Sequence, residues 1–172
     1  MRSYVIFAVI LLLSRFSFAD AVITSALDSP ELVGSGQYRA MLMKIYEAEL
    51  YTNDGEFDML RPFALKLIYS RKLKGDAISD KSMDLIRRQG VEDEMLLEDW
   101  HFQLNDIFPD VENGTEIVGV HEAGVGARFY VDGALVGSIV DPALCENFFG
   151  IWFAEDTSAP KLRSALLGLE SN

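Results

Sequence analysis

Four side chains, spread from the first third of the chain to the last, are candidates for holding a small ligand. Arg39 lies in a segment rich in tyrosine and methionine, and a guanidinium there can pair with a carboxylate or a phenolate through two parallel hydrogen bonds. Tyr46 and Tyr69 can each direct a hydroxyl toward the same ligand, and Trp152 can form part of the wall of such a site. These residue types are typical of an apolar site with a polar anchor.

Each candidate also has a purely structural interpretation. Arg39 can be a solvated arginine of an edge strand, or one paired with Glu47 or Glu49. A tyrosine in a strand is commonly half-buried, with its hydroxyl at the surface. The Phe148–Trp152 run can fill the core between a helix and a sheet instead of lining a pocket. The sequence leaves these alternatives open.

Other reactive side chains are few. Cys145 is the single cysteine, and its helical surroundings favour a small core residue over a nucleophile, which would need a nearby base or cation. His101 and His121 are far apart and have no ligand-like spacing to Asp, Glu or Cys. We therefore predict no catalytic residue, no metal site and no cofactor.

The first residues are typical of a cleaved export signal. Arg2 precedes an apolar run from Val5 to Leu13, and small residues follow at Ser17 and Ala19. The run is shorter than the ~20 residues that span a bilayer as a helix. We expect residues 1–19 to be a signal peptide, with a second possible cut after Ala21, and residues 20–172 to be one periplasmic domain without a membrane span.

Composition excludes other classes of protein. The apolar fraction of 49% suits a packed globular domain rather than a disordered chain. The formal net charge of −12 repels phosphate backbones, so nucleic acid is not an expected partner. No feature of the sequence indicates a particular protein partner.

The elements that must position these residues follow from periodicity and turn signals. We expect a loop over Asp28–Gly36, a strand over Tyr38–Tyr51 with a possible bend, and a central strand over Phe63–Tyr69. Helices are expected over Ile78–Gln89 and Glu92–Ile107, because acidic residues lie in or before their first turns and Gly90 and Pro109 end them.

The last third returns to strands and then to helices. Strands are expected over Thr115–His121, Ala127–Val131 and Ala134–Val140, with Asp132-Gly133 as a two-residue hairpin turn. Asp141 caps a helix and Pro160 opens the last one. This order predicts an α+β domain with helices on a largely antiparallel sheet, and a βαβ sheet is the alternative.

Several blocks of sequence together resemble the chalcone isomerase-like family, in particular its bacterial periplasmic members, over about residues 31–168. The blocks are Gly34–Arg39, Lys44–Tyr51, Phe63–Tyr69, Trp100 with Phe108–Val111, and Asp141–Gly168. The resemblance implies an open-faced sandwich, in which a curved antiparallel sheet is covered by a helical layer with a cleft between them.

The family contains isomerases that close a flavanone ring and relatives that bind fatty acids without catalysis. In the enzymes an Arg holds the phenolate, while a Thr and a Tyr organise a water, helped by a Lys and an Asn. Arg39 is the candidate for the Arg, but Tyr46 occupies the position of the Thr, and no residue here matches the catalytic Tyr, Lys and Asn. Gly150–Phe153 replaces the Thr and its small apolar neighbour.

The leading hypothesis is an exported, non-catalytic protein that binds a small amphipathic or fatty-acid-like ligand between sheet and helices. Arg39 is its expected carboxylate anchor, and Tyr46, Tyr69 and Trp152 are the expected wall. The alternatives are an intramolecular lyase of the chalcone isomerase type and a protein-interaction module of the cell envelope. The lyase hypothesis needs Arg39 and Tyr46 at one substrate.

Overall fold

Strands that are consecutive in the chain are neighbours in one sheet. The structure is a computed structural model and describes residues 17–169. The six strands are antiparallel in the order β1-β2-β3-β4-β5-β6, which confirms the predicted antiparallel sheet and not the βαβ alternative. They are β1 Glu31–Ala40, β2 Met43–Thr52, β3 Phe63–Tyr69, β4 Glu116–Glu122, β5 Gly126–Val131 and β6 Ala134–Ile139.

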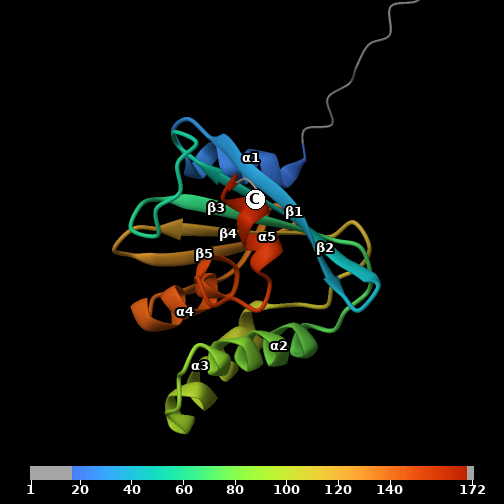
Figure 1. Ribbon diagram of the computed structural model, residues 1–172, viewed down its shortest axis with the longest axis vertical. Helices are drawn as coiled ribbons and strands as arrows, with labels where there is room; N and C mark the ends of the chain where they lie inside the picture. Colours follow the sequence, from blue (N-terminus) through green and yellow to red (C-terminus); the bar gives the residue numbers. More distant parts are fainter. Residues whose placement is uncertain (1–16, 170–172) are drawn as a thin grey trace, which may run out of the picture.

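Helices lie on both sides of this sheet. Figure 1 shows α2, α3 and α4 on one side and α1 on the other. The helices are α1 Phe18–Ala26, α2 Gly75–Arg88, α3 Glu94–Ile107, α4 Pro142–Phe153 and α5 Pro160–Leu166. The fold is the expected α+β sandwich, except that α1 covers part of the face that an open-faced sandwich leaves free.

The two sides follow from alternation along the central strand. Phe63, Leu65 and Leu67 of β3 belong to the main core under α2–α5. Ala64 lies on the other side, in a smaller core with α1. Successive side chains of a strand point to opposite faces of the sheet. A strand with apolar side chains on both faces must therefore be covered by other elements on both faces. The expectation of a central strand here is confirmed.

The expected single strand over Tyr38–Tyr51 is a hairpin instead. Ala40 pairs with Met43, and Met41 and Leu42 form the turn between β1 and β2. Met41 has a φ of 57°, a conformation that glycine, asparagine or aspartate usually takes in such turns. Because the turn lacks those residues, nothing in the sequence interrupts the alternation of side chains. The two strands are therefore expected as one.

Most of the expected loop over Asp28–Gly36 belongs to β1. Its glycines allow close packing rather than a turn: a Cβ on Gly34 would lie 2.1 Å from the carbonyl oxygen of Ala165 in α5. Gly36 likewise faces Leu162 of the same helix. Helix α5 can therefore lie directly on the edge of the sheet.

Helix caps agree with the sequence where an aspartate supplies them. Asp141 accepts hydrogen bonds from the backbone N–H groups of Ala143 and Leu144 at the start of α4, and its other oxygen accepts one from Trp100 Nε1 at 2.9 Å. Helix α2 begins at Gly75, three residues before the expected start, and Lys74 occupies its cap position without a side-chain bond.

Helix α1 is the element that the sequence does not predict. It overlaps the end of the expected signal peptide, of which residues 1–16 lie outside the described part. Ser17 caps the helix and Ala19 is fully buried. Within residues 17–169 no helix is both long enough and apolar enough to cross a bilayer.

Candidate functional site

A pocket of about 250 Å³ lies between the inner face of β1–β3 and the helices α2 and α4. Its walls are mostly aliphatic and aromatic, with Leu65 and Leu67 from the sheet, Ile78 and Leu85 from α2 and Ile151 from α4. An apolar cavity of roughly 150 Å³ is enough to bind benzene. The pocket can therefore accept an apolar group larger than one aromatic ring.

A row of three tyrosines crosses one wall of the pocket. Tyr38, Tyr46 and Tyr69 are direct partners across β1, β2 and β3. The rings of Tyr38 and Tyr46 are stacked at 5.1 Å, and those of Tyr46 and Tyr69 meet edge-on at 5.7 Å. All three line the pocket, and cross-strand aromatic pairs of this kind stabilise the sheet as well.

Trp152 closes the row from α4. Its indole Nε1 donates a hydrogen bond to the Tyr46 hydroxyl at 3.0 Å. A phenol that accepts through its oxygen keeps its own proton, so Tyr46 can still donate to a ligand. Within residues 17–169 the Tyr69 hydroxyl has no hydrogen-bond partner, which leaves it as a second donor at the pocket.

These phenols act as neutral donors. Burial raises the pKa of Tyr46 well above the ordinary value, and the neighbouring Tyr69 raises it further, against a smaller opposite effect of the Trp152 hydrogen bond. Burial alone raises the pKa of Tyr69. Neither hydroxyl ionises near neutral pH, so neither serves as a general base there.

Lys81 supplies a cation at the rim. It projects from α2, lines the pocket and is exposed. Among residues 17–169 no carboxylate lies within 4.0 Å of its ammonium group. An apolar cavity with two phenol donors and a lysine at its rim is complementary to an apolar chain that ends in a carboxylate.

Arg39 does not share the pocket with the other three candidates. Its neighbours Tyr38 and Ala40 line the pocket. Because successive side chains of a strand point to opposite faces of the sheet, Arg39 points to the face away from the pocket. The side chain is exposed, and Nη2 donates to the carbonyl oxygen of Leu42 at 2.8 Å. Of its two structural interpretations, Arg39 fits the solvated arginine of an edge strand, since β1 is an edge of the sheet. It is not paired with Glu47 or Glu49, which pair with Lys44 and Lys66.

The Phe148–Trp152 run combines both of its interpretations. Phe149 is fully buried against Phe63 and Phe129, as a core residue would be. Phe148 and Trp152, in edge-on contact at 5.5 Å, also line the pocket. Phe149 lines the pocket as well, so the same run fills the core and forms part of the pocket wall.

Tyr38 and Lys81 line the pocket but are not among the candidates of the sequence analysis. Tyr38 appears there only as the first residue of an expected strand, and its place in the pocket depends on the register between β1 and β2. Lys81 recurs with Ile78 and Leu85 on one face of α2, so helical periodicity is the signal that places it beside apolar wall residues.

Comparison with known proteins agrees with this geometry. A family model described as chalcone isomerase-like matches residues 16–168. The chain belongs to the chalcone isomerase-like family. No curated protein matches the sequence.

One solved structure similar to this chalcone isomerase-like chain is a fatty-acid binding protein of Arabidopsis thaliana. The TM-score is 0.63 at 15% sequence identity, over 83% of this chain and 89% of that one. At this identity the likeness establishes the fold, and it leaves the ligand of this family member to be argued from its own residues.

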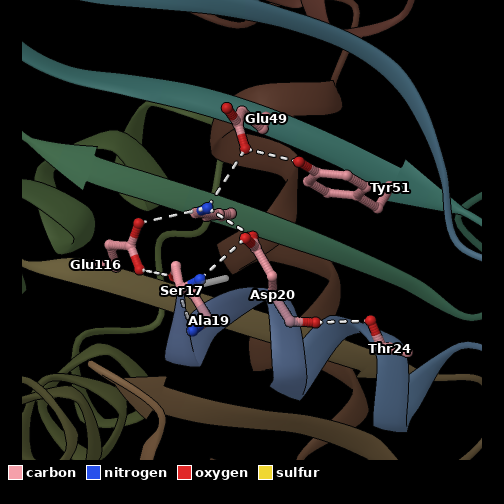
Figure 2. A network of polar contacts seen from close by, with 8 residues as sticks. Ser17, Ala19, Asp20, Thr24, Glu49, Tyr51 and Glu116 are labelled. Carbon is pink, nitrogen blue, oxygen red and sulfur yellow. Dashed lines mark hydrogen bonds and ion pairs between the residues drawn. The ribbon is translucent and has the colours of Figure 1, made fainter. Parts of the chain in front are cut away.

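A second polar cluster of this family member lies on the other face of the sheet (Figure 2). The ammonium nitrogen of Lys66 is 2.9 Å from Asp20 of α1, 3.4 Å from Glu116 and 3.7 Å from Glu49. The Lys66 side chain is only 6% exposed. Tyr51 donates to Glu49 at 2.8 Å and completes the cluster on β2.

The charges of this cluster hold a helix rather than perform chemistry. Burial by itself would lower the pKa of Lys66, but the hydrogen bond to Asp20 and the charges of Glu49 and Glu116 outweigh it, and the pKa is raised. A lysine with a raised pKa is a cation and not a nucleophile. Asp20 thereby fastens α1 to the sheet.

The remaining reactive groups offer no site. Burial, with a smaller contribution from Asp141, raises the pKa of the Cys145 thiol to about 11, so the thiol stays protonated and unreactive at neutral pH. In the described part of the chain no three His, Cys, Asp or Glu side chains are arranged to hold a metal ion.

Proposed function

We propose that this protein binds a small amphipathic carboxylic acid of the fatty-acid type and performs no chemistry on it. The observation that carries the proposal is the apolar pocket of about 250 Å³ with Tyr46, Tyr69 and Lys81 among its lining residues. The name of the Arabidopsis structure supports the same ligand class.

The acyl chain lies between the aliphatic side chains of the sheet and those of α2. Its carboxylate accepts hydrogen bonds from the tyrosine hydroxyls and faces the ammonium group of Lys81. In this proposal Lys81 takes the role of anchor that the sequence suggested for Arg39. The lyase alternative loses its support, because Tyr46 lines the pocket on one face of the sheet while Arg39 points to the other face, so the two side chains cannot hold one substrate.

Occupation of the pocket is tested by filling it. Decanoate binding is measured by calorimetry for the wild type, for Ala77→Trp, whose new ring enters the pocket from α2, and for Ala143→Trp as control on an exposed position of α4. We expect at least about a tenfold loss for Ala77→Trp, since the ring takes the volume of the ligand, and little change for the control. Equal affinities for all three proteins would refute binding in this pocket.

Recognition of the carboxylate is tested separately with decanol, which has the same chain without the charge. Lys81→Gln is expected to weaken decanoate about fivefold, as one partly exposed ion pair contributes ~1 kcal/mol, and to leave decanol unchanged. Lys161→Gln on α5 is the control for loss of one positive charge. A parallel loss for decanol would show that Lys81 acts through packing and not through charge.

We also propose that the chain is exported to the periplasm by residues 1–19. The support is the order of Arg2, the apolar run and the small residues before Asp20. In a Gram-negative host the protein should appear in the periplasmic fraction at reduced mass, and Leu11→Arg should retain it in the cytoplasm at full mass. Full-length protein in the cytoplasm of wild-type cells would contradict export.

A further inference from the structure

The tip of the β1–β2 hairpin exposes apolar side chains without a structural reason. Met41 is 92% exposed, Leu42 89% and Met43 49%. Exposed apolar residues that lie singly are ordinary, but three in succession at a projecting turn form a patch. Figure 1 shows this hairpin reaching an edge of the molecule, away from α1 and α4.

The backbone of the turn makes the choice of residues more unusual. A two-residue hairpin turn favours glycine, asparagine or aspartate, and Met41 adopts its φ of 57° despite its side chain. Strain of this kind is commonly kept where the side chain has a use. Neither Met41 nor Leu42 gains burial in return, so the use lies outside the folded chain.

The charges beside the tip are positive, on a protein whose net charge is −12. Arg39 donates to the Leu42 carbonyl, and the Arg71 guanidinium lies 3.0 Å from the sulfur of Met43. Within residues 17–169 neither arginine has a carboxylate within 4.0 Å, whereas Lys44 close by is paired with Glu47. The two arginines are therefore available to an anionic partner.

The tip is continuous with the pocket. The residues that precede it, Tyr38 and Ala40, and those that follow it, Ile45 and Tyr46, all line the cavity. A partner that meets the turn is therefore a few residues away from the pocket wall on both strands.

We propose that this hairpin tip docks on the surface of an anionic lipid bilayer. Met41 and Leu42 enter the boundary between headgroups and acyl chains, while Arg39 and Arg71 pair with lipid phosphates. The negative charge elsewhere does not prevent this, because charges beyond the ~8 Å screening length of physiological salt are felt weakly. Docking does not depend on which ligand the pocket holds. If the ligand is derived from lipid, docking places the pocket next to the bilayer that supplies it.

The test is cosedimentation of the whole protein with vesicles of phosphatidylglycerol and phosphatidylcholine, and with vesicles of phosphatidylcholine alone. We expect binding to the anionic vesicles that weakens as salt is raised. The double variant Met41→Ser/Leu42→Ser should bind about tenfold less tightly through loss of apolar insertion. The double variant Arg39→Gln/Arg71→Gln should lose roughly 25-fold, since each basic residue near such a surface contributes about fivefold.

Matched controls separate the tip from general effects. Leu60→Ser removes an apolar side chain that is 82% exposed in another loop, and Arg87→Gln/Arg88→Gln removes two positive charges at the end of α2. Both should bind as the wild type does. None of the altered side chains is buried, although Arg71 is only partly exposed, so circular dichroism melting is expected to show every variant folded. The proposal is overturned if the wild type ignores anionic vesicles, if the tip variants bind as well as the controls, or if neutral vesicles bind equally.

Discussion

Lys66 illustrates how much a single buried charge depends on its neighbours. It sits on the α1 side of a strand whose other side faces the main core, and it is surrounded by Asp20, Glu49 and Glu116. Alternation along β3 makes this environment inevitable once α1 covers the face, because the residue between Leu65 and Leu67 must point the other way.

Replacement of Lys66 by Met should destabilise the fold by about 3 kcal/mol, because three carboxylates then lose their common cation in a poorly solvated place. Lys44→Met breaks a half-exposed pair with Glu47 and should cost less than about 1 kcal/mol. Urea denaturation at neutral pH measures both. Equal losses for the two variants would mean that burial contributes nothing to the Lys66 cluster.

Stability should also fall in mild acid because of His121. Burial lowers its pKa, although its hydrogen bond to the Arg61 carbonyl and the nearby Glu122 act in the opposite sense. The unfolded chain takes up the proton near pH 6.5 and the folded chain only at lower pH, so stability present above about pH 6.5 is lost as the pH falls toward the folded value. His121→Phe, which keeps a ring against Phe63, should show a shallower decline between about pH 7 and 5.5 in urea titrations. An unchanged slope would assign the effect to other groups.

The pocket residues show which part of the site is predictable. Tyr46, Tyr69 and Trp152 are recognisable as aromatic wall residues from their strands and helix. Their meeting in one pocket, and the exclusion of Arg39, depend on strand register and on the parity of each position. Those relations are long-range, so residue type and spacing along the chain do not contain them.

At the scale of elements, predictions succeed where a local signal exists. Asp132 and Gly133 both have positive φ, as their hairpin turn requires, and Asp141 caps α4. Helix α3 begins at Glu94, two residues after the expected start, because Asp93 is its cap and not part of its first turn. The Met41–Leu42 turn lacks such a signal and is missed. Helix α1 is missed for another reason: its small and apolar residues fit the end of an export signal equally well.

Helix α1 makes a measurable prediction about the beginning of the folded chain. A chain that starts at Ser17 should be more stable than one that starts at Asp20 by about 1 to 2 kcal/mol, because the shorter chain lacks the Ser17 cap and the buried Ala19. Urea denaturation compares the two. Equal stability would mean that α1 begins to contribute only at Asp20, where its bond to Lys66 lies.

At the scale of the whole molecule, ligand binding should be visible as stabilisation. A ligand that binds only the folded protein, at 100 times its dissociation constant, adds about 2.7 kcal/mol to the free energy of unfolding. Decanoate should therefore raise the melting temperature of the wild type, and Ala77→Trp should show little rise at the same concentration. An identical rise in both proteins would point to binding outside the pocket.

The sequential order of the strands in the sheet also affects how the newly made chain can fold. Each strand from β2 to β6 pairs with the strand that directly precedes it in the chain, so it finds a partner as soon as it is made. During synthesis the sheet can therefore extend in the order of translation, and few strand edges stay exposed to neighbouring chains while it grows. The helices α4 and α5 emerge last, so the pocket has all of its walls only after both have packed against the sheet.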